Sequence, residues 1–174
     1  LPDANSVDRS EPVVTRLSID GSGQSTGDWV ILLAAGNSLH VADALTGEIL
    51  WSAGANGPEL AIAGFASLPS APRVLDLDGD GYVDRSYVLD MTGGLWRFNF
   101  TSGQSGGELA TAARLARLGT GAHHFHASPD VFIARIGTEN RISIAAGSGW
   151  ISRPREATIE DRLYVIYDLE SADN

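Results

Sequence analysis

The sequence predicts an all-β protein, part of a β-propeller of about two to three blades at roughly four strands per blade. Two observations carry this prediction. Short β-type runs alternate with turn residues along the 174 residues, which include 20 Gly and 7 Pro. The sequence also resembles itself when it is shifted so that Asp20 falls on Asp76, a repeat length typical of propeller blades.

The predicted strands are apolar, β-branched or aromatic runs bounded by Gly, Asn, Asp or Pro. They are 13–19, 29–34, 39–42, 73–75, 86–89, 95–100, 131–136, 141–145 and 163–167. Residues 108–118 are rich in alanine, so they fit either a short helix or an irregular strand. About ten strands make fewer than three blades, whereas closed propellers have roughly 4–8. We therefore expect an open assembly rather than a ring.

The internal repeat contains a turn loop, an apolar strand, a hairpin with glycine and a second strand. It aligns Leu33 with Leu89 and Leu39 with Leu95. A third, fainter copy places two strands around the turn at 137–140. The expected blade units are 11–60, 70–102 and 128–168 within a single domain. The chain begins at Leu1 rather than Met, so we expect a processed product or a piece of a longer protein.

The most specific motif is the acidic loop at 76–84, which reads D-L-D-G-D-G-Y-V-D. Four carboxylates within nine residues repel one another unless a cation joins them. Calcium prefers oxygen ligands, and alternating aspartates wrap their side chains around one centre where a glycine permits the turn. We expect Gly81 to make that turn, and we expect the ligands to be Asp76, Asp78, Asp80, the backbone carbonyl of Tyr82 and Asp84.

An EF-hand is excluded because its twelfth position requires Glu between two helices, whereas Tyr87 occupies that position within a predicted strand. Asp84 is therefore the expected closing ligand of a calcium loop that links strands. Calcium is preferred to magnesium because a flexible acidic loop does not impose a tight octahedron. The aligned positions Asp20, Ser22, Gln24 and Asp28 keep the spacing but have two carboxylates, which indicates a loop that has lost its metal.

The charge balance excludes several partners. The sequence has 22 Asp and Glu against 12 Lys and Arg, a formal net charge of −10 and a pI near 4.6. Nucleic acid and anionic membrane surfaces are therefore unsuitable partners. No apolar run approaches the roughly 20 residues of a membrane-spanning helix. The chain has no Cys, so it has no disulfide and no thiolate site.

Residues 39–51 combine a strand, a D-A-L-T-G turn, a second strand and Trp51. This segment resembles the tryptophan-docking repeat of quinoprotein-type propellers, in which Asp and Thr fix the turn and Trp packs between blades. An ordinary hairpin with a core tryptophan is the alternative for this motif alone. Trp96, Phe98 and Phe100 alternate on one strand and are expected in the core.

In chain order, several segments resemble the C-terminal propeller domain of the PilY family of type IV pilus tip-associated biogenesis proteins and adhesins. They include VTRLSIDGSGQSTGDWVILLAAGNSLHVADALTGEILWSAG, PRVLDLDGDGYVDRSYVLDMTGGLWRFNF, ASPDVF and ISIAAGSGWISRPREATIEDRLYVIYD. The resemblance implies a modified propeller with calcium at the loop ligands named above. It further implies a bacterial extracellular or envelope location, and virulence-associated fimbrial roles in pilus extension and retraction, twitching motility and surface attachment. Minor pilins and host or abiotic surfaces are the implied partners.

The alternative function is a calcium-stabilised lectin-like domain or a quinoprotein-type enzyme. The enzyme class holds its cofactor on the axis of a full ring, and too few blades are expected here, so we expect a non-enzymatic domain. A transition-metal site at His123, His124, His126 and Asp130 is also weighed. Adjacent His123 and His124 point to opposite faces of an extended segment, so we expect a plain loop before Pro129.

Overall fold

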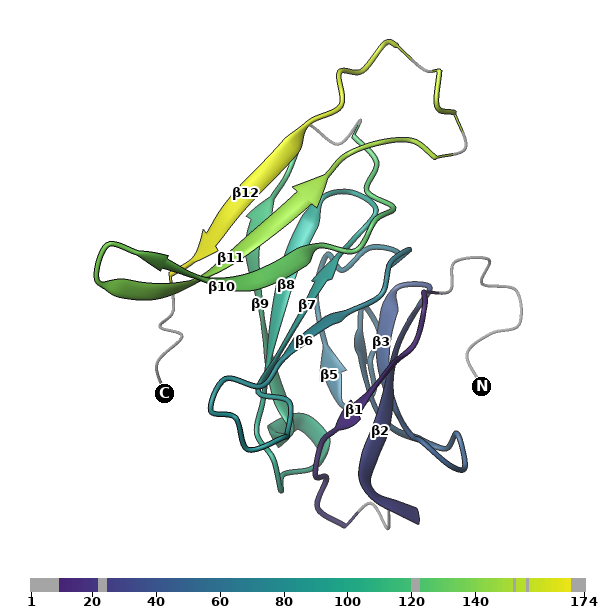
Figure 1. Cartoon of the computed structure of the whole chain (residues 1–174). Coiled ribbons are helices and arrows are strands. Elements are labelled where there is room, and N and C mark those ends of the chain that lie inside the picture. The colour runs from purple at the N-terminus through teal and green to yellow at the C-terminus, as the bar shows by residue number, and fades with distance from the viewer. Residues whose placement is uncertain (1–9, 22–24, 120–122, 152, 156, 170–174) are drawn as a thin grey trace.

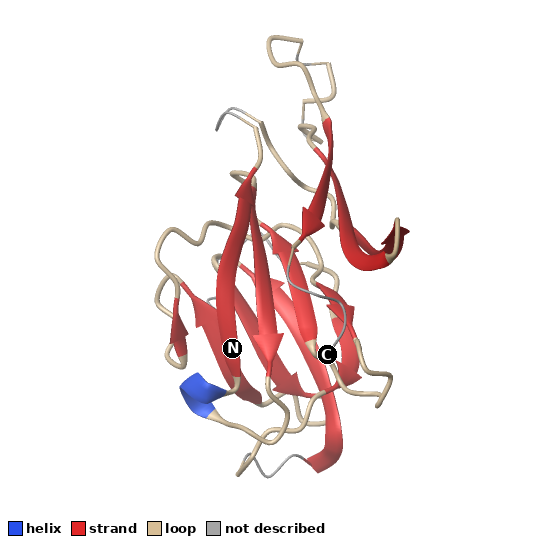
Figure 2. Cartoon of the chain, turned by 90° about the vertical axis from the view of Figure 1, so that its left-hand side faces the viewer, coloured by secondary structure: helices blue, strands red, loops and turns tan. Residues whose placement is uncertain are grey.

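Three consecutive, mainly antiparallel sheets make up the described part of the protein, as the computed structural model shows (Figure 1). The structure describes residues 10–21, 25–119, 123–151, 153–155 and 157–169. Apart from one short 3-10 helix, η1 (Gly106–Glu108), the described regular elements are strands (Figure 2). The all-β prediction is therefore confirmed, and the strands form three successive sheets.

The first sheet has the order β1-β2-β3-β4-β5. Its strands are β1 (Val13–Arg16), β2 (Ser25–Ala35), β3 (Ser38–Asp43), β4 (Ile49–Gly54) and β5 (Leu60–Ala61). All neighbours are antiparallel except β4 and β5, which are parallel. The hairpin between β2 and β3 is tight because Ala35 pairs with Ser38, and Gly36 provides the positive φ of 57° that such a turn requires.

The second sheet has the order β6-β7-β8-β9, and it carries the acidic loop between its first two strands. Its strands are β6 (Arg73–Leu75), β7 (Arg85–Leu89), β8 (Gly94–Phe100) and β9 (Ala110–Arg117). The ambiguous alanine-rich segment is a strand, because β9 pairs along the whole of β8. Pairing with β8 satisfies the backbone of both strands, and this tertiary effect outweighs the helical propensity of alanine.

The third sheet consists of β10 (Asp130–Ile136), β11 (Glu139–Gly147) and β12 (Leu163–Asp168), in that order. A tight turn joins β10 to β11, since Ile136 pairs with Glu139 and Gly137 has a positive φ. The connection from β11 to β12 is longer, and residues 152 and 156 in it lie outside the described residues.

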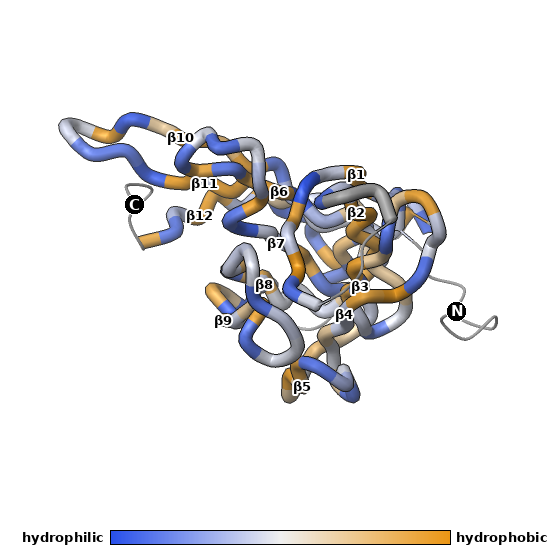
Figure 3. The backbone as a smooth tube through the Cα atoms, turned by 90° about the horizontal axis from the view of Figure 1, so that it is seen from below, coloured by the Kyte–Doolittle hydropathy of each residue, from blue (hydrophilic) through white to orange (hydrophobic). Residues whose placement is uncertain are grey.

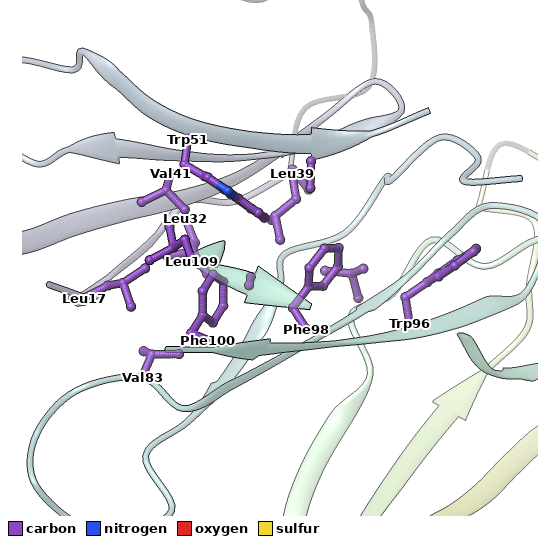
Figure 4. Packing of buried hydrophobic residues seen from close by; sticks show 14 of the residues in the cluster. Leu17, Leu32, Leu39, Val41, Trp51, Val83, Trp96, Phe98, Phe100 and Leu109 are labelled. Atoms are coloured by element: carbon purple, nitrogen blue, oxygen red, sulfur yellow. The ribbon is translucent and has the colours of Figure 1, made fainter. Parts of the chain in front are cut away.

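The second sheet is packed between the other two, which lie on opposite sides of it (Figure 3). Phe98 and Phe100 of β8 point toward Trp51 of the first sheet (Figure 4), and Trp96 on the same face packs edge-on against Phe65, which follows β5. On the opposite face, Tyr87, Leu89 and Leu95 meet Ile142, Ile144 and Ala146 of β11. Each residue of β7 is buried, because both faces of this strand are covered. The core position expected for the β8 aromatics is confirmed.

The internal repeat corresponds to equivalent strands, with one difference in register. Leu39 and Leu95 occupy equivalent places, since each is buried between its own sheet and the next one. Leu33 and Leu89 are not equivalent. Leu33 pairs with His40, whereas Leu89 pairs with Leu95, so the two hairpins differ by one residue. A shift of one residue turns a side chain to the other face, and Leu32 rather than Leu33 enters the core.

Candidate metal centre

The acidic loop connects β6 to β7 and is closed by its own backbone. Asp76 accepts hydrogen bonds from the backbone N–H groups of Gly79 (2.7 Å) and Gly81 (2.8 Å). Gly79 and Gly81 have φ values of 79° and 90°, which side chains other than glycine rarely tolerate. Gly81 therefore makes the turn expected of it, and the chain folds back over the Asp76 carboxylate.

Three carboxylates converge in this loop. One oxygen each of Asp76, Asp78 and Asp84 lies within 4.8 Å of the others, with the first two side chains exposed and the third partly buried. Asp84 is the best anchored, because its carboxylate accepts from the Leu77 N–H and its backbone bonds to Leu75 and Phe100. Converging carboxylates on a glycine-permitted turn are a donor set that suits a hard divalent cation.

Asp80 and Tyr82, the other two residues expected to supply ligands, make contacts outside the converging group. Asp80 is not in the converging group, and its carboxylate accepts the N–H of Tyr82 at 2.8 Å. The Tyr82 side chain leaves the loop and reaches the first sheet, where its hydroxyl donates to Asp28 at 2.6 Å. This hydrogen bond raises the pKa of the Tyr82 hydroxyl, which is therefore protonated at neutral pH.

Asp28 belongs to the loop that aligns with the acidic loop. Ser22 and Gln24 of that predicted relic lie outside the described residues. Asp28 lies in β2 and accepts from the Tyr82 hydroxyl, and its carboxylate lies 3.8 Å from the Arg16 guanidinium. The residue aligned with Asp84, the expected closing ligand, therefore accepts a hydrogen bond from a tyrosine of the acidic loop.

The D-A-L-T-G turn has the predicted geometry. The Asp43 carboxylate accepts from the backbone N–H groups of Leu45 and Thr46 and from the Thr46 hydroxyl, and Gly47 has a φ of 70°. Trp51 donates to the Gly106 carbonyl and packs edge-on against Phe98 and Phe100 of the second sheet. It therefore lies between two neighbouring sheets, as the docking repeat implies.

A second aspartate turn was missed by the sequence reasoning. In the hairpin between β7 and β8, Asp90 accepts from Thr92 and Gly94 and also from the indole N–H of Trp96 at 2.8 Å. The sequence D-M-T-G at 90–93 carried the signal, because it repeats the Asp, Thr and Gly of the first turn with one residue fewer.

A buried charge cluster joins the second sheet to the third, and it too was missed. Asp168 at the end of β12 accepts from Arg97 of β8 at 2.7 and 2.9 Å and from the Tyr87 hydroxyl at 2.8 Å. Arg85 lies 3.9 Å from the same carboxylate. Burial, followed by the hydrogen bond to Asp168, raises the pKa of Tyr87 well above its usual range. The cluster is structural, since its members face the core between the sheets.

His123, His124 and His126 contact aromatic rings and backbone and are not part of the converging carboxylate group. The His124 ring lies tilted against Trp150, with 4.3 Å between the ring centres, and stacks on His126 at 6.2 Å, while a nitrogen of the His123 ring lies 3.2 Å from the Glu160 carbonyl oxygen. In the described part of the chain, the group of Asp76, Asp78 and Asp84 is where three metal-ligating side chains converge. Within the same residues, no helix has the length and apolar character needed to cross a membrane.

The stacked antiparallel sheets with an acidic loop at one sheet edge define an all-β protein of the class to which the PilY1 C-terminal domain belongs. The crystal structure of that domain from Pseudomonas aeruginosa superposes with a TM-score of 0.71 and 20% sequence identity. The match covers 95% of this chain and 38% of that one. This likeness establishes the fold.

Sequence comparison leads to the same protein. The chain is 31% identical over 97 residues to "Type IV pilus biogenesis factor PilY1" of Pseudomonas aeruginosa, in strains PAO1 and PAK. The match covers 54% of this chain and 8% of the relative, so the chain spans a small part of that protein's length. No family model matches the sequence. The resemblance predicted from the motifs is confirmed in sequence and in fold.

Proposed function

We propose that the chain is a calcium-binding, non-enzymatic part of the propeller domain of a type IV pilus biogenesis protein. The observation that carries the proposal is the convergence of Asp76, Asp78 and Asp84 in a loop of a fold shared with PilY1. Carboxylate oxygens on a flexible loop favour calcium, which accepts 6–8 oxygen ligands at variable angles. Magnesium requires a tighter octahedron, which this loop does not impose.

The proposed ligands are Asp76, Asp78, Asp80, the Tyr82 carbonyl and Asp84. Three carboxylates already converge, and Asp80 has one carboxylate oxygen that accepts the Tyr82 N–H. A carboxylate can accept this bond and still bind a cation through its other oxygen. The exposed position of Asp76 and Asp78 leaves room for water ligands, which complete the coordination shell of calcium in such loops.

The biological part of the proposal rests on the similarity to PilY1, which is named a type IV pilus biogenesis factor. We infer a bacterial protein of the cell envelope or exterior that acts at the pilus and contacts minor pilins. In this role calcium regulates pilus extension and retraction, and through them twitching motility and attachment to host or abiotic surfaces.

A calcium titration followed by calorimetry tests the site. The chain should bind one calcium ion, and Asp84→Ala should abolish or greatly weaken binding because it removes the anchored closing ligand. Asp130→Asn is the matched control, since it removes an acidic group from the exposed β10 strand and should bind calcium normally. Equal binding by Asp84→Ala and the unchanged chain would contradict the assignment.

The cellular role is tested in the full-length protein that contains this chain. Asp84→Ala in that protein should change the number of surface pili and the twitching zone in a calcium-dependent way, whereas Asp130→Asn should not. A glycan panel screened with and without calcium separates the lectin-like alternative. Specific glycan binding with unchanged pili would favour the lectin and contradict the pilus proposal.

A further inference from the structure

We propose that Tyr82 couples calcium binding in the loop to the packing of the first sheet against the second. The inference rests on the proposed calcium site and goes beyond it, because it assigns a role to a side chain that does not bind the ion. Tyr82 is a positioning residue: its backbone belongs to the loop, and its side chain is held by a different sheet.

The Tyr82 ring is held on two sides. Its hydroxyl donates to Asp28 at 2.6 Å and accepts from an N–H of the Arg16 guanidinium at 2.6 Å. The Arg16 guanidinium also lies over the ring, 4.2 Å from its centre, and 3.8 Å from the Asp28 carboxylate. Arg16 and Asp28 are provided by β1 and β2, so the three groups form one polar cluster across the two sheets.

The next residue makes a second connection along the same path. Val83 is buried in the core between the first and second sheets, and its backbone N–H donates to the Arg16 carbonyl at 3.0 Å. Two successive residues of the loop are therefore anchored to the first sheet. A movement of the loop at this point requires that the Arg16 and Asp28 contacts move or break.

The loop positions on either side of this anchor are the proposed ligands. Asp80 precedes Tyr82 by two residues, and Asp84 follows it by two. Asp80 also accepts the Tyr82 N–H, so the orientation of the Tyr82 peptide affects a ligand directly. A cation that draws the carboxylates together selects one conformation of residues 80–84. The contacts of Tyr82 with Asp28 and Arg16 also restrict the conformation of these residues, so the two effects are coupled.

Linkage makes the coupling reciprocal. Suppose that the loop binds calcium in the conformation in which Tyr82 contacts Asp28. The contact then increases the calcium affinity by some factor, and bound calcium must favour the contact between the sheets by the same factor. The cluster is about one-third exposed at Arg16 and Asp28, so solvent screens it and its effect is moderate. A calcium affinity lower by roughly threefold to tenfold is expected without the Tyr82 hydroxyl, the scale of one typical net hydrogen bond, because solvent screens the charge of Asp28.

The first test compares calcium affinities of variants that keep all four loop aspartates. Tyr82→Phe keeps the ring and removes the hydroxyl, and Asp28→Ala removes its acceptor from the other sheet. Both should weaken calcium binding within the range given above. Tyr167→Phe is the matched control, because Tyr167 is an exposed tyrosine on the third sheet, and its affinity should be unchanged.

A double variant separates coupling from general damage. If Tyr82 and Asp28 act through one hydrogen bond, Tyr82→Phe with Asp28→Ala should lose no more affinity than either alone. Losses that multiply, or wild-type affinity in Tyr82→Phe, would overturn the inference. Failure of the unchanged chain to bind calcium would instead overturn the proposed calcium site, so the two failures are distinct.

Hydrogen exchange distinguishes coupling through Tyr82 from a purely structural role of this residue, because it measures where calcium protects the backbone amides. In the unchanged chain, calcium should slow exchange of the Val83 amide and of the Leu17 amide, which donates to the Asp28 carbonyl at 2.8 Å. In Tyr82→Phe at saturating calcium, the slowing should remain at the Gly79 and Gly81 amides and be lost at Leu17. Equal calcium protection of Leu17 in both proteins would contradict the coupling.

Discussion

At the scale of single residues, Asp168 decides how the third sheet is fixed to the second. Asp168 is 3% exposed, and its carboxylate faces two arginines and a tyrosine of the second sheet. A buried carboxylate of this kind is stable because its partners compensate for lost hydration. Removing it takes a buried carboxylate partner away from both Arg85 and Arg97, so Asp168 is more than a surface ion-pair partner.

Tyr87 makes the stability of this cluster depend on alkaline pH. Its pKa is raised in the folded state, chiefly by burial, so the folded protein keeps the proton to higher pH than the unfolded chain. The contribution of the protonated Tyr87 to the free energy of unfolding is therefore complete below about pH 10, the usual tyrosine pKa, and it decreases as the pH rises above this value. We expect the free energy of unfolding to fall by up to about 1.4 kcal/mol per pH unit from this one proton.

Urea unfolding at pH 9, 10 and 11 measures this slope, and Tyr87→Phe should reduce it while lowering stability at neutral pH by roughly 1–3 kcal/mol. Tyr167→Phe serves as the control, since that side chain is exposed. An unchanged slope in Tyr87→Phe would show that the tyrosine does not titrate differently in the folded state.

At the scale of elements, the acidic loop is a local structure that the sheet completes. Asp76, Gly79 and Gly81 close the turn by themselves, whereas Asp84 is fixed because β7 begins beside it. The end of the loop at Asp84 is therefore preformed, whereas the part with Asp76 and Asp78 is exposed and less restrained. Binding of a cation should order the less restrained part and stabilise the connection from β6 to β7.

Calcium should therefore stabilise the folded chain. At 100 times its dissociation constant, a ligand of the native state adds about 2.7 kcal/mol to the free energy of unfolding. For a chain of this size we expect the melting temperature to rise by roughly 5–10 °C, and chelation should reverse the rise. Differential scanning calorimetry with calcium, magnesium and chelator measures these shifts.

Asp84→Ala is the informative variant in the same experiment. It should show a much smaller calcium-dependent shift than the unchanged chain, with Asp130→Asn again as the control. Full calcium stabilisation of Asp84→Ala would refute the closing ligand, and equal stabilisation by magnesium would contradict the choice of calcium.

At the scale of the whole molecule, the two outer sheets each have an open face with apolar side chains. On the third sheet, Phe132, Val165 and Leu163 are 47%, 57% and 75% exposed, on the side away from the core residues Ile142 and Ile144. On the first sheet, Val14 is 62% and Trp29 49% exposed. Exposed apolar faces of this kind promote association between proteins.

The isolated chain should therefore self-associate as its concentration rises, which analytical ultracentrifugation measures. Leu163→Lys with Val165→Lys should reduce the association, because two charges on this face oppose burial, while stability changes little at such exposed positions. Thr101→Lys with Ser102→Lys is the charge-matched control, placed in an exposed turn of the second sheet. A monomer at all concentrations would refute the association.

Much of the local structure was predictable from the sequence. The strand positions follow from apolar runs between turn residues, and the acidic loop follows from the spacing of aspartates around Gly81, because neighbours along the chain decide both. The Asp43 turn was predictable for the same reason. The Asp90 turn carried the same residue types but was not recognised.

The tertiary structure alone decided the features that join distant segments. Tyr82 meets Asp28 and Arg16 across 54 and 66 residues of sequence, and Asp168 meets Arg97 and Tyr87 across 71 and 81. The strand formed by 110–117 likewise depends on its pairing with β8, not on its alanine-rich composition. The physical reason is that burial and hydrogen-bond partners are set by which sheets pack together, so a tyrosine or an aspartate gains its role only after the sheets have assembled.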